Sequence, residues 1–294
     1  MTDKPETVSL CQFFHRFPDE EVARKYFENN RWDGEASCPH CGSLSVAEVK
    51  NLKPMPYRCR DCRQHFSVRT GTILADSRLP LNKWLMAIYI MTTARKGIPS
   101  TQMARELGIT QKSAWFLAQR IRETWLAGSG GDMGDHVQVD ETHVGGREKN
   151  KHADKKLQAG PGTVGKTAVV GIHSENGEVH AELVADTKAP TRQAFVQLHA
   201  NAGAKVVTDT HGGYVGLERA GYTHIRVNHS AGQYVNDMAH TNGIESFWSL
   251  LKRGYIGVYH CMSAKHLDAC VNEFTFRHNP SKAGTMQFIE MTAS

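Results

Sequence analysis

Three acidic residues have the type, order and spacing needed to hold divalent cations. Asp140 follows the apolar stretch Val-Gln-Val, Asp209 follows Lys-Val-Val-Thr, and Glu245 opens a predicted helix, with 35 residues between Asp209 and Glu245. Mg²⁺ prefers hard oxygen donors, and two such ions can stabilise both the attacking and the leaving oxygen of a phosphoryl transfer. One acid alone would more often be a turn or cap residue, so the prediction depends on the ordered set of three.

A lysine extends the predicted site. Lys252 lies seven residues, or two helical turns, after Glu245, so it faces the same way and could hold a DNA phosphate. Carboxylates that lie close together repel one another, and we therefore expect the metal-free site to be strained or partly protonated. We also expect the three carboxylates to converge within a few ångströms of a common point even without metal.

Two Cys-x-x-Cys pairs predict a structural zinc site. Cys38-Pro-His-Cys41 and Cys59-Arg-Asp-Cys62 are separated by 17 residues, a spacing that presents four thiolates tetrahedrally to one Zn²⁺. The short segment around these pairs has too little core to fold without a metal, so we expect one closed, structural Zn²⁺ per chain. The alternative is a redox-active dithiol.

Residues 100–117 have the spacing of a helix-turn-helix. The small residue Ala104 lies where two helices would cross, and Gly108 lies at the tight turn between them. The second helix would present four polar residues to bases and phosphates: Gln111, Lys112, Ser113 and Arg120. The alternative is an ordinary helical hairpin whose polar side chains are only solvated.

Charge is distributed unevenly along the 294 residues. The whole chain has a formal charge of +5, whereas residues 31–126 hold 15 Lys and Arg against 7 Asp and Glu, or +8. Such a basic segment is expected where a polyanion binds. The start of the chain lacks a basic region followed by an apolar core, and the most apolar run, 84–94, is too short to cross a membrane. We therefore expect a cytoplasmic protein with no membrane role.

Hydrophobic periodicity gives the elements that must position these residues. It predicts helices at 19–30, 84–93, 100–125 with a break at Gly108, 191–201, 242–253 and 263–277, and strands at 136–142, 167–173, 178–185, 204–208 and 224–228. The Gly- and Asp-rich stretch 126–136 is interpreted as a hinge, and the basic stretch 145–166 as a mobile loop. The predicted domains are an N-terminal helical segment (1–32), a zinc ribbon (33–72), a helix-turn-helix (76–126) and a catalytic domain (133–294).

Taken together, these motifs resemble those of bacterial insertion-sequence transposases of the ISXO-like group. The matching stretches are RWDGEASCPHCG, YRCRDCRQHFSVRTGT, LPLNKW, QVDETHVGG, VNHS, HTNGIESFWSLLKRGYIGVYH and EFTFRHN. The resemblance implies an α/β multidomain protein, in which an RNase-H-like mixed-sheet DDE domain follows a zinc ribbon and a helix-turn-helix.

The same resemblance implies the activity. Mg²⁺-dependent hydrolysis would occur at the ends of the element, followed by attack of the freed 3′-OH on target DNA. Asp140, Asp209 and Glu245 match the DDE positions, with Lys252 as the accompanying lysine. Two Mg²⁺, for which Mn²⁺ could substitute, and double-stranded DNA are the implied cofactors and partner. A homo-oligomer on DNA and a nucleoid-associated location in the bacterial cytoplasm are also expected.

Two other classes of protein fit part of the pattern. A DNA-binding regulator derived from a transposase would keep the ribbon and the helix-turn-helix but would tolerate loss of the acids, and all three acids are present in order. A nuclease of RNase H type would need no zinc ribbon and would hydrolyse DNA without joining ends. Both hypotheses are therefore less favoured than a transposase.

Overall fold

The computed structural model describes residues 8–126, 133–146, 152–155, 162–209, 212–227 and 240–279. The chain divides into two compact units, one built on Met1–Thr124 and the other on Trp125–Ser281. Within the described residues, every helix is too short or too polar to cross a bilayer. Half of the basic stretch 145–166 and most of the hinge 126–136 lie outside the described residues.

The N-terminal unit begins with two capped helices. Helix α1 (Leu10–Arg16) starts at a capping box formed by Ser9 and Gln12, and α2 (Glu20–Trp32) starts at Asp19, whose side chain accepts a hydrogen bond from the Val22 N–H at 2.9 Å. Sequence periodicity predicted α2 within two residues but not the shorter α1. Asp33 ends α2 in the left-handed conformation (φ 46°).

A small antiparallel sheet follows α2. Its strands β1 (Val46–Glu48), β2 (Tyr57–Cys59) and β3 (His65–Phe66) pair in the order β1-β2-β3. Trp32, at the end of α2, packs edge-on against Tyr57 and Phe66, with ring centroids 5.3 and 5.9 Å away. This aromatic group is the apolar core of the ribbon.

Three helices complete the N-terminal unit. They are α3 (Leu81–Thr93), α4 (Ser100–Leu107) and α5 (Gln111–Leu126). The Glu20 carboxylate accepts hydrogen bonds from the first N–H groups of α3, at 2.8 Å from Leu81 N and 2.9 Å from Asn82 N, which ties α2 to α3. Gly108 adopts the left-handed conformation (φ 59°) that ends α4 and permits the short turn to α5.

The C-terminal unit contains a five-stranded mixed sheet. Its strands are β4 (His136–Val144), β5 (Thr167–Ser174), β6 (Val179–Val184), β7 (Lys205–Asp209) and β8 (Thr223–Val227), in the order β6-β5-β4-β7-β8. β4, β5 and β6 pair antiparallel, whereas β7 is parallel to both β4 and β8. This order and these directions define an RNase-H-like sheet and confirm the predicted fold class.

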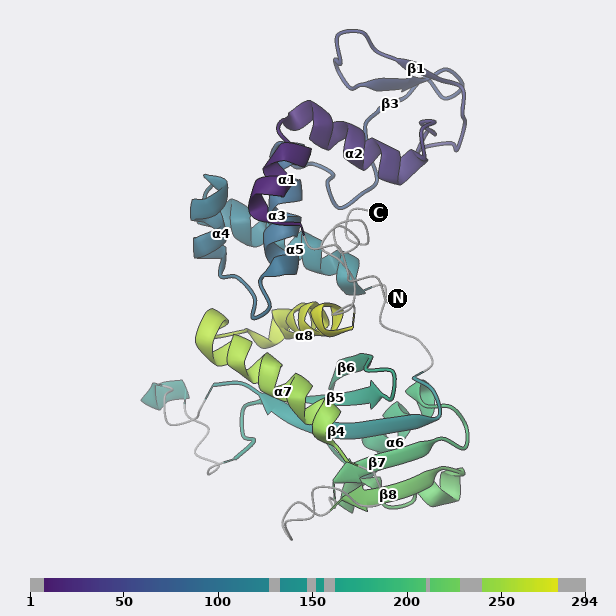
Figure 1. Cartoon of the computed structure of the whole chain (residues 1–294), viewed down its shortest axis with the longest axis vertical. Helices are drawn as coiled ribbons and strands as arrows, with labels where there is room; N and C mark the ends of the chain where they lie inside the picture. Colours follow the sequence, from purple (N-terminus) through teal and green to yellow (C-terminus); the bar gives the residue numbers. More distant parts are fainter. Residues whose placement is uncertain are drawn as a thin grey trace. The chain divides into compact units, whose positions relative to one another are not determined.

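Helices cover both faces of this sheet (Figure 1). Helix α6 (Ala189–His199) packs on one face, where Phe195 and Val196 join Val137 and Val139 in one apolar cluster. Helices α7 (Asn242–Gly254) and α8 (Ala264–His278) pack on the other face. Between them, Tyr255–Tyr259 forms one π-helical turn, and short 3₁₀ turns lie at Ala153–Lys155, Gly212–Tyr214 and Leu217–Ala220.

Gly171 on β5 allows α7 to lie close against the sheet. A Cβ added at this residue would meet the Trp248 ring at 2.7 Å and the Ile244 side chain at 3.0 Å. Both side chains are buried. The absence of a side chain at position 171 therefore sets the distance between α7 and the central strands.

Gly171→Ala is expected to destabilise the C-terminal unit by about 1–3 kcal/mol, because the new methyl group must displace a buried tryptophan. Chemical denaturation would measure this change. Gly146→Ala is the matched control, since a Cβ there would meet nothing within 4 Å. Equal stability of the two variants would show that α7 does not need this close approach.

Candidate active site

Asp140 and Asp209 lie side by side on neighbouring parallel strands. The register pairs Val139 with Thr208, so Asp140 and Asp209 each follow one residue later. The strand predicted at 136–142 is two residues longer in the structure, because β4 continues to Val144 along β5. It is β7 that ends at Asp209, and this leaves both carboxyl groups at the same edge of the parallel pair.

Gln138 fixes the start of α7 to β4. Its Oε1 accepts hydrogen bonds from the backbone N–H groups of Gly243 at 2.9 Å and Ile244 at 3.2 Å. Gln138 and Asp140 point to the same face of β4 because strand side chains alternate. The first turn of α7 is therefore held over the face that bears Asp140.

Glu245 lies in that first turn. Thr241, which precedes α7, is buried, and its hydroxyl donates a hydrogen bond to Glu245 Oε1 at 2.7 Å. The helix begins at Asn242, as predicted, and Glu245 is its fourth residue. The hydroxyl of Thr241 orients a carboxylate that is otherwise exposed to solvent.

The three acids share one electrostatic environment. Burial is the main cause that raises the pKa of Asp140, from 3.8 to about 6. The negative charges of Glu141, Glu245 and Asp209 raise this pKa further, while the backbone N–H of Glu141 acts in the opposite direction. Asp140 therefore holds its proton more readily than an ordinary carboxyl group, as expected for a metal-free cluster of acids.

The acids are spaced more widely than the ligands of a single small cation. In the described part of the chain, two groups of three or more side chains place their ligand atoms within 4.8 Å of one another, and the three acids are not such a group. Mutual repulsion opposes closer approach without a metal. The expected convergence on one point within a few ångströms therefore stays a prediction.

A buried network beside the acids was not foreseen from the sequence. Glu141 is paired with Arg192 of α6 at 2.6 Å and accepts a hydrogen bond from the Tyr214 hydroxyl at 2.8 Å. A Cβ at Gly213 would lie 2.3 Å from the Arg192 guanidinium, so only glycine leaves room for this arginine. The network holds β4 against α6 and gives the Glu141 carboxylate, next to Asp140, a positively charged partner. The only sequence signal was the Asp-Glu pair itself.

Lys252 is exposed on α7, two turns beyond Glu245. The charge of Lys252 affects His143 on β4. Burial is the largest cause that lowers the pKa of His143, and the positive charges of Lys166, Arg192 and Lys252 lower this pKa further. Positive groups thus lie within electrostatic range of the carboxylate edge, where a phosphate would be attracted.

The four predicted zinc ligands come together in the N-terminal unit. Their sulfur atoms all lie within 4.8 Å of one another. The Sγ atoms of Cys38 and Cys62 are 3.6 Å apart, and those of Cys41 and Cys59 are 3.7 Å apart. Tetrahedral coordination with Zn–S bonds of about 2.3 Å gives sulfur separations of about 3.8 Å, whereas a disulfide requires about 2.0 Å. The site therefore fits a structural zinc ion.

The predicted recognition helix starts with exposed polar residues. Gln111 and Lys112 are exposed at the start of α5. The Gln111 Nε2 donates a hydrogen bond to Ser100 Oγ at 2.9 Å, and the hydroxyl groups of Ser113 and Thr110 lie 2.9 Å apart. These weak surface contacts leave the first turn of α5 accessible to a partner.

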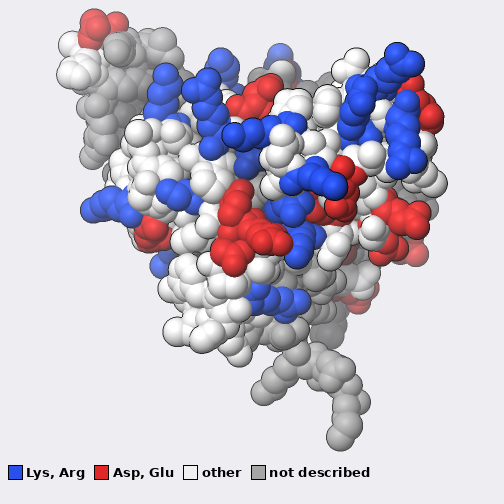
Figure 2. Space-filling model, turned by 90° about the horizontal axis from the view of Figure 1, so that it is seen from above, with Lys and Arg blue, Asp and Glu red and all other residues white. Residues whose placement is uncertain are grey.

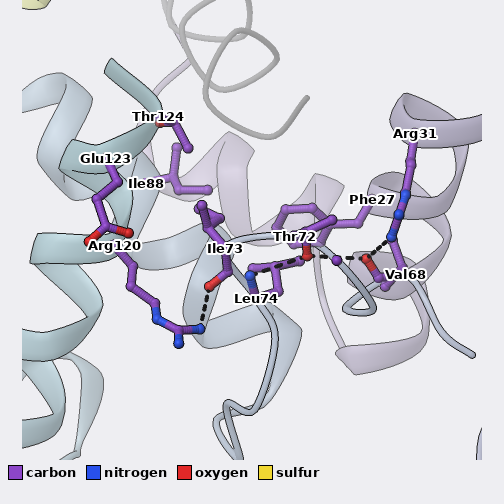
Figure 3. A pocket seen from close by; sticks show the side chains of 11 residues that line it. Phe27, Arg31, Val68, Thr72, Ile73, Leu74, Ile88, Arg120, Glu123 and Thr124 are labelled. Atoms are coloured by element: carbon purple, nitrogen blue, oxygen red, sulfur yellow. Dashed lines mark hydrogen bonds between the residues drawn. The ribbon is translucent and has the colours of Figure 1, made fainter. Parts of the chain in front are cut away.

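Arg120 has a different environment. Its guanidinium donates hydrogen bonds to the carbonyl oxygens of Ile73, at 2.7 Å, and Ala75, and it lies 4.7 Å from the Phe116 ring centroid. Arg120 also lines a pocket of about 530 Å³ beside the loop that follows the ribbon, opposite Arg31 (Figure 3). These bonds indicate a structural task for Arg120, which had been expected to contact DNA.

The surface charge is mixed in sign. Figure 2 shows a face on which Lys and Arg side chains lie among groups of Asp and Glu side chains. Exposed basic residues of the ribbon include Arg58, Arg60 and Arg63. The face drawn in Figure 2 is therefore not uniformly basic.

An RNase-H-like sheet with acids at the edge of its central strands is typical of polynucleotidyl transferases, the enzymes that cut and join nucleic acid strands. Residues 132–279 match the ISXO2-like transposase domain, and residues 18–65 match a transposase zinc-ribbon domain. The chain belongs to the family of ISXO2-like insertion-sequence transposases.

The chain is also similar to one curated protein and to several solved structures. The chain is 27% identical over 273 residues to an uncharacterized protein in transposable element ISH50 of Halobacterium salinarum, covering 89% of this chain and 91% of the relative. Among solved structures, the catalytic core domain of BIV integrase (15% identity, TM-score 0.30) covers 48% of this chain and 80% of that chain. The Mos1 transposase paired-end complex with the left transposon end (10% identity, TM-score 0.26) covers 67% and 76%. These likenesses are remote, so the fold assignment depends on strand order and on the family match.

Asp140→Asn is expected to stabilise the metal-free protein at pH 8. The folded state raises the pKa of Asp140 from 3.8 to about 6, so above this range the ionised side chain disfavours folding by about 1–3 kcal/mol. The neutral amide removes this cost, and the gain should vanish below pH 4, where Asp140 is protonated in both states. Denaturation curves across pH 4–8 would measure it.

Asp186→Asn is the control. A hydrogen bond from Thr191 lowers the pKa of this half-buried carboxyl group, so its removal should give no gain in stability at pH 8. If Asp140→Asn also gave none, the burial of an ionised Asp140 would not be unfavourable.

Proposed function

We propose that this protein is a DNA transposase that binds the terminal inverted repeats of its own insertion sequence, cleaves DNA there and transfers the freed strands to target DNA. One observation carries the proposal. Asp140, Asp209 and Glu245 meet in one electrostatic environment, on adjacent strands and the helix that Gln138 holds against them. A regulator that lacks catalysis would have no need for this costly set of acids.

The three carboxylates would hold two Mg²⁺ ions, or Mn²⁺ in their place. The donor set fits because it consists of hard oxygens and because the raised pKa of Asp140 shows that its negative charge is unfavourable until a cation balances it. The bound ions would stabilise charge on the phosphate and lower the pKa of the attacking water or 3′-OH. Thr241 would keep Glu245 oriented toward them, and Lys252 would hold a neighbouring phosphate.

The N-terminal unit would recognise DNA. In this proposal, Gln111, Lys112 and Ser113 of α5 contact the terminal repeat, and the ribbon with its single structural Zn²⁺ adds backbone contacts. Arg120 would contribute to DNA binding indirectly, by holding the loop around Ile73 in place. Strand transfer at two element ends calls for a homo-oligomer on DNA, located with the nucleoid in the bacterial cytoplasm.

The acids should act as a unit. Asp140→Ala, Asp209→Ala and Glu245→Ala should each reduce cleavage and strand transfer by at least about 1,000-fold, or roughly 4 kcal/mol in the barrier. The triple variant should be scarcely worse, because two remaining carboxylates cannot hold both ions in line with the scissile bond. A strand-transfer assay with the ends of the element would measure this.

Two variants serve as comparisons. Lys252→Ala should cost on the order of tenfold, because a phosphate-positioning charge contributes less than a metal ligand. Lys188→Ala alters an exposed lysine paired with Asp186 and should retain activity. All acid variants should still bind the terminal repeat. Undiminished strand transfer by Asp209→Ala would refute the mechanism and favour the regulator.

Repeat recognition should depend on the start of α5. Gln111→Ala should reduce the preference for the terminal repeat over random DNA by roughly tenfold, while Lys112→Ala should weaken binding to both and reduce its salt dependence. Arg120→Ala should instead lower thermal stability, because it removes bonds to two loop carbonyls. Unchanged preference in Gln111→Ala and Lys112→Ala, measured by competition binding, would assign recognition to another surface.

A further inference from the structure

A second group of metal-ligating side chains lies in the C-terminal unit, away from the three acids. His180 and Glu182 project from β6, the edge strand of the sheet, and His199 lies in the last turn of α6. Their ligand atoms all lie within 4.8 Å of one another. The two imidazole ring centroids are 4.2 Å apart.

The histidines of this group are buried without the hydrogen bonds that buried rings need. His180 and His199 are each 8% exposed. Within the described residues, the Nε2 atoms of both rings have no hydrogen-bond partner. The nearest acceptor is the Glu182 carboxylate, at 3.7 Å from His180 Nε2 and 4.0 Å from His199 Nε2. A buried ring nitrogen without a partner is unfavourable, so this arrangement calls for a ligand.

We propose that His180, Glu182 and His199 form a second metal site, for Zn²⁺ or a similar borderline divalent cation. Tetrahedral coordination with bonds of about 2.1 Å places ligand atoms about 3.4 Å apart, so the observed 3.7 and 4.0 Å separations need only a small contraction. The Glu182 side chain is 39% exposed, which leaves a path for the ion and room for water as a further ligand.

The donors separate this site from the site of the acids. Two imidazoles and one carboxylate suit zinc and its neighbours, whereas three carboxylates suit Mg²⁺. The faces also differ: His180 and Glu182 pair with Ile172 and Val170 of β5, which belong to the apolar cluster beneath α6. Asp140 lies on the opposite face of the sheet, under α7. The inference is thus independent of the proposed function.

The bound ion would link the edge strand β6, through His180 and Glu182, to His199 of α6. The positive ion would lie at the C-terminal end of that helix, where the helix dipole favours a cation. Phe195 packs against both rings, with centroids 6.0 Å from His180 and 4.7 Å from His199, and shields the site on one side. Burial is the largest cause that lowers the pKa of His199, which favours the neutral ring that a metal requires.

Zinc stoichiometry of the full-length protein tests the proposal. At micromolar free zinc, the wild-type protein should bind two Zn²⁺ per chain by elemental analysis, one in the ribbon and one here. His199→Ala and Glu182→Gln should each bind one, with affinity at the second site reduced more than about 100-fold. Cys59→Ser should lose the ribbon ion and keep the other. His136→Ala should still bind two, because His136, which lies 3.8 Å from Glu175, belongs to neither group of ligands in the described part of the chain.

Cadmium-113 NMR gives a second measurement that does not depend on stoichiometry. Wild-type protein loaded with Cd²⁺ should show one resonance typical of thiolate ligands and another typical of nitrogen and oxygen ligands, and Glu182→Gln should lose the second alone. Glu182 is half-exposed, so this variant should fold even if the histidine variants do not. One zinc per chain in the wild type, or a second resonance that survives Glu182→Gln, would overturn the proposal.

Discussion

The candidate active site depends on how closely the start of α7 approaches strand β4. Gln138 fixes this approach by accepting hydrogen bonds from two N–H groups that α7 could not satisfy internally. Two glycines make it sterically possible: Gly171 leaves space for Trp248, and a Cβ at Gly243 would lie 2.5 Å from the His173 ring. Without this contact, Glu245 would have no fixed position relative to Asp140 and Asp209. The catalytic geometry is thus set by residues that carry none of the chemistry.

Neighbouring acids on β4 have opposite roles because strand side chains alternate between faces. Glu141 points toward α6, where Arg192 and Tyr214 satisfy it. Asp140 points toward α7, and the charges that raise its pKa are the carboxylates of Glu141, Glu245 and Asp209. Removing a buried partner from a pair such as Glu141 with Arg192 costs several kcal/mol, so the paired acid stabilises the fold. Asp140 is instead buried near other negative charges, which is unfavourable for its ionised form, and a bound cation would offset this cost.

Sequence patterns predicted the elements better than the contacts between them. Short apolar segments between polar turns placed all five strands of the large sheet within one or two residues of their observed ends, because such segments report burial directly. The predicted strand at 136–142 already continued past Asp140, but the sequence did not reveal that the end of β7 leaves that carboxyl group at the edge of the parallel pair. Nor did it reveal the bonds of Arg120 to Ile73 and Ala75, or the Arg192 network, because these depend on how elements distant in sequence pack.

The His180, Glu182 and His199 group shows why such sites escape sequence analysis. His-x-Glu on a strand places two ligands on one face, a pattern too common to indicate a metal. The third ligand comes from the end of a helix, and its contribution depends on where α6 docks on the sheet. The chain offers three chemically distinct donor sets. They are four thiolates in the ribbon, two imidazoles with one carboxylate at the edge strand and the end of α6, and three carboxylates on β4, β7 and α7. Because their preferences differ, a chain with all three could take up structural zinc without losing its carboxylate site to that ion.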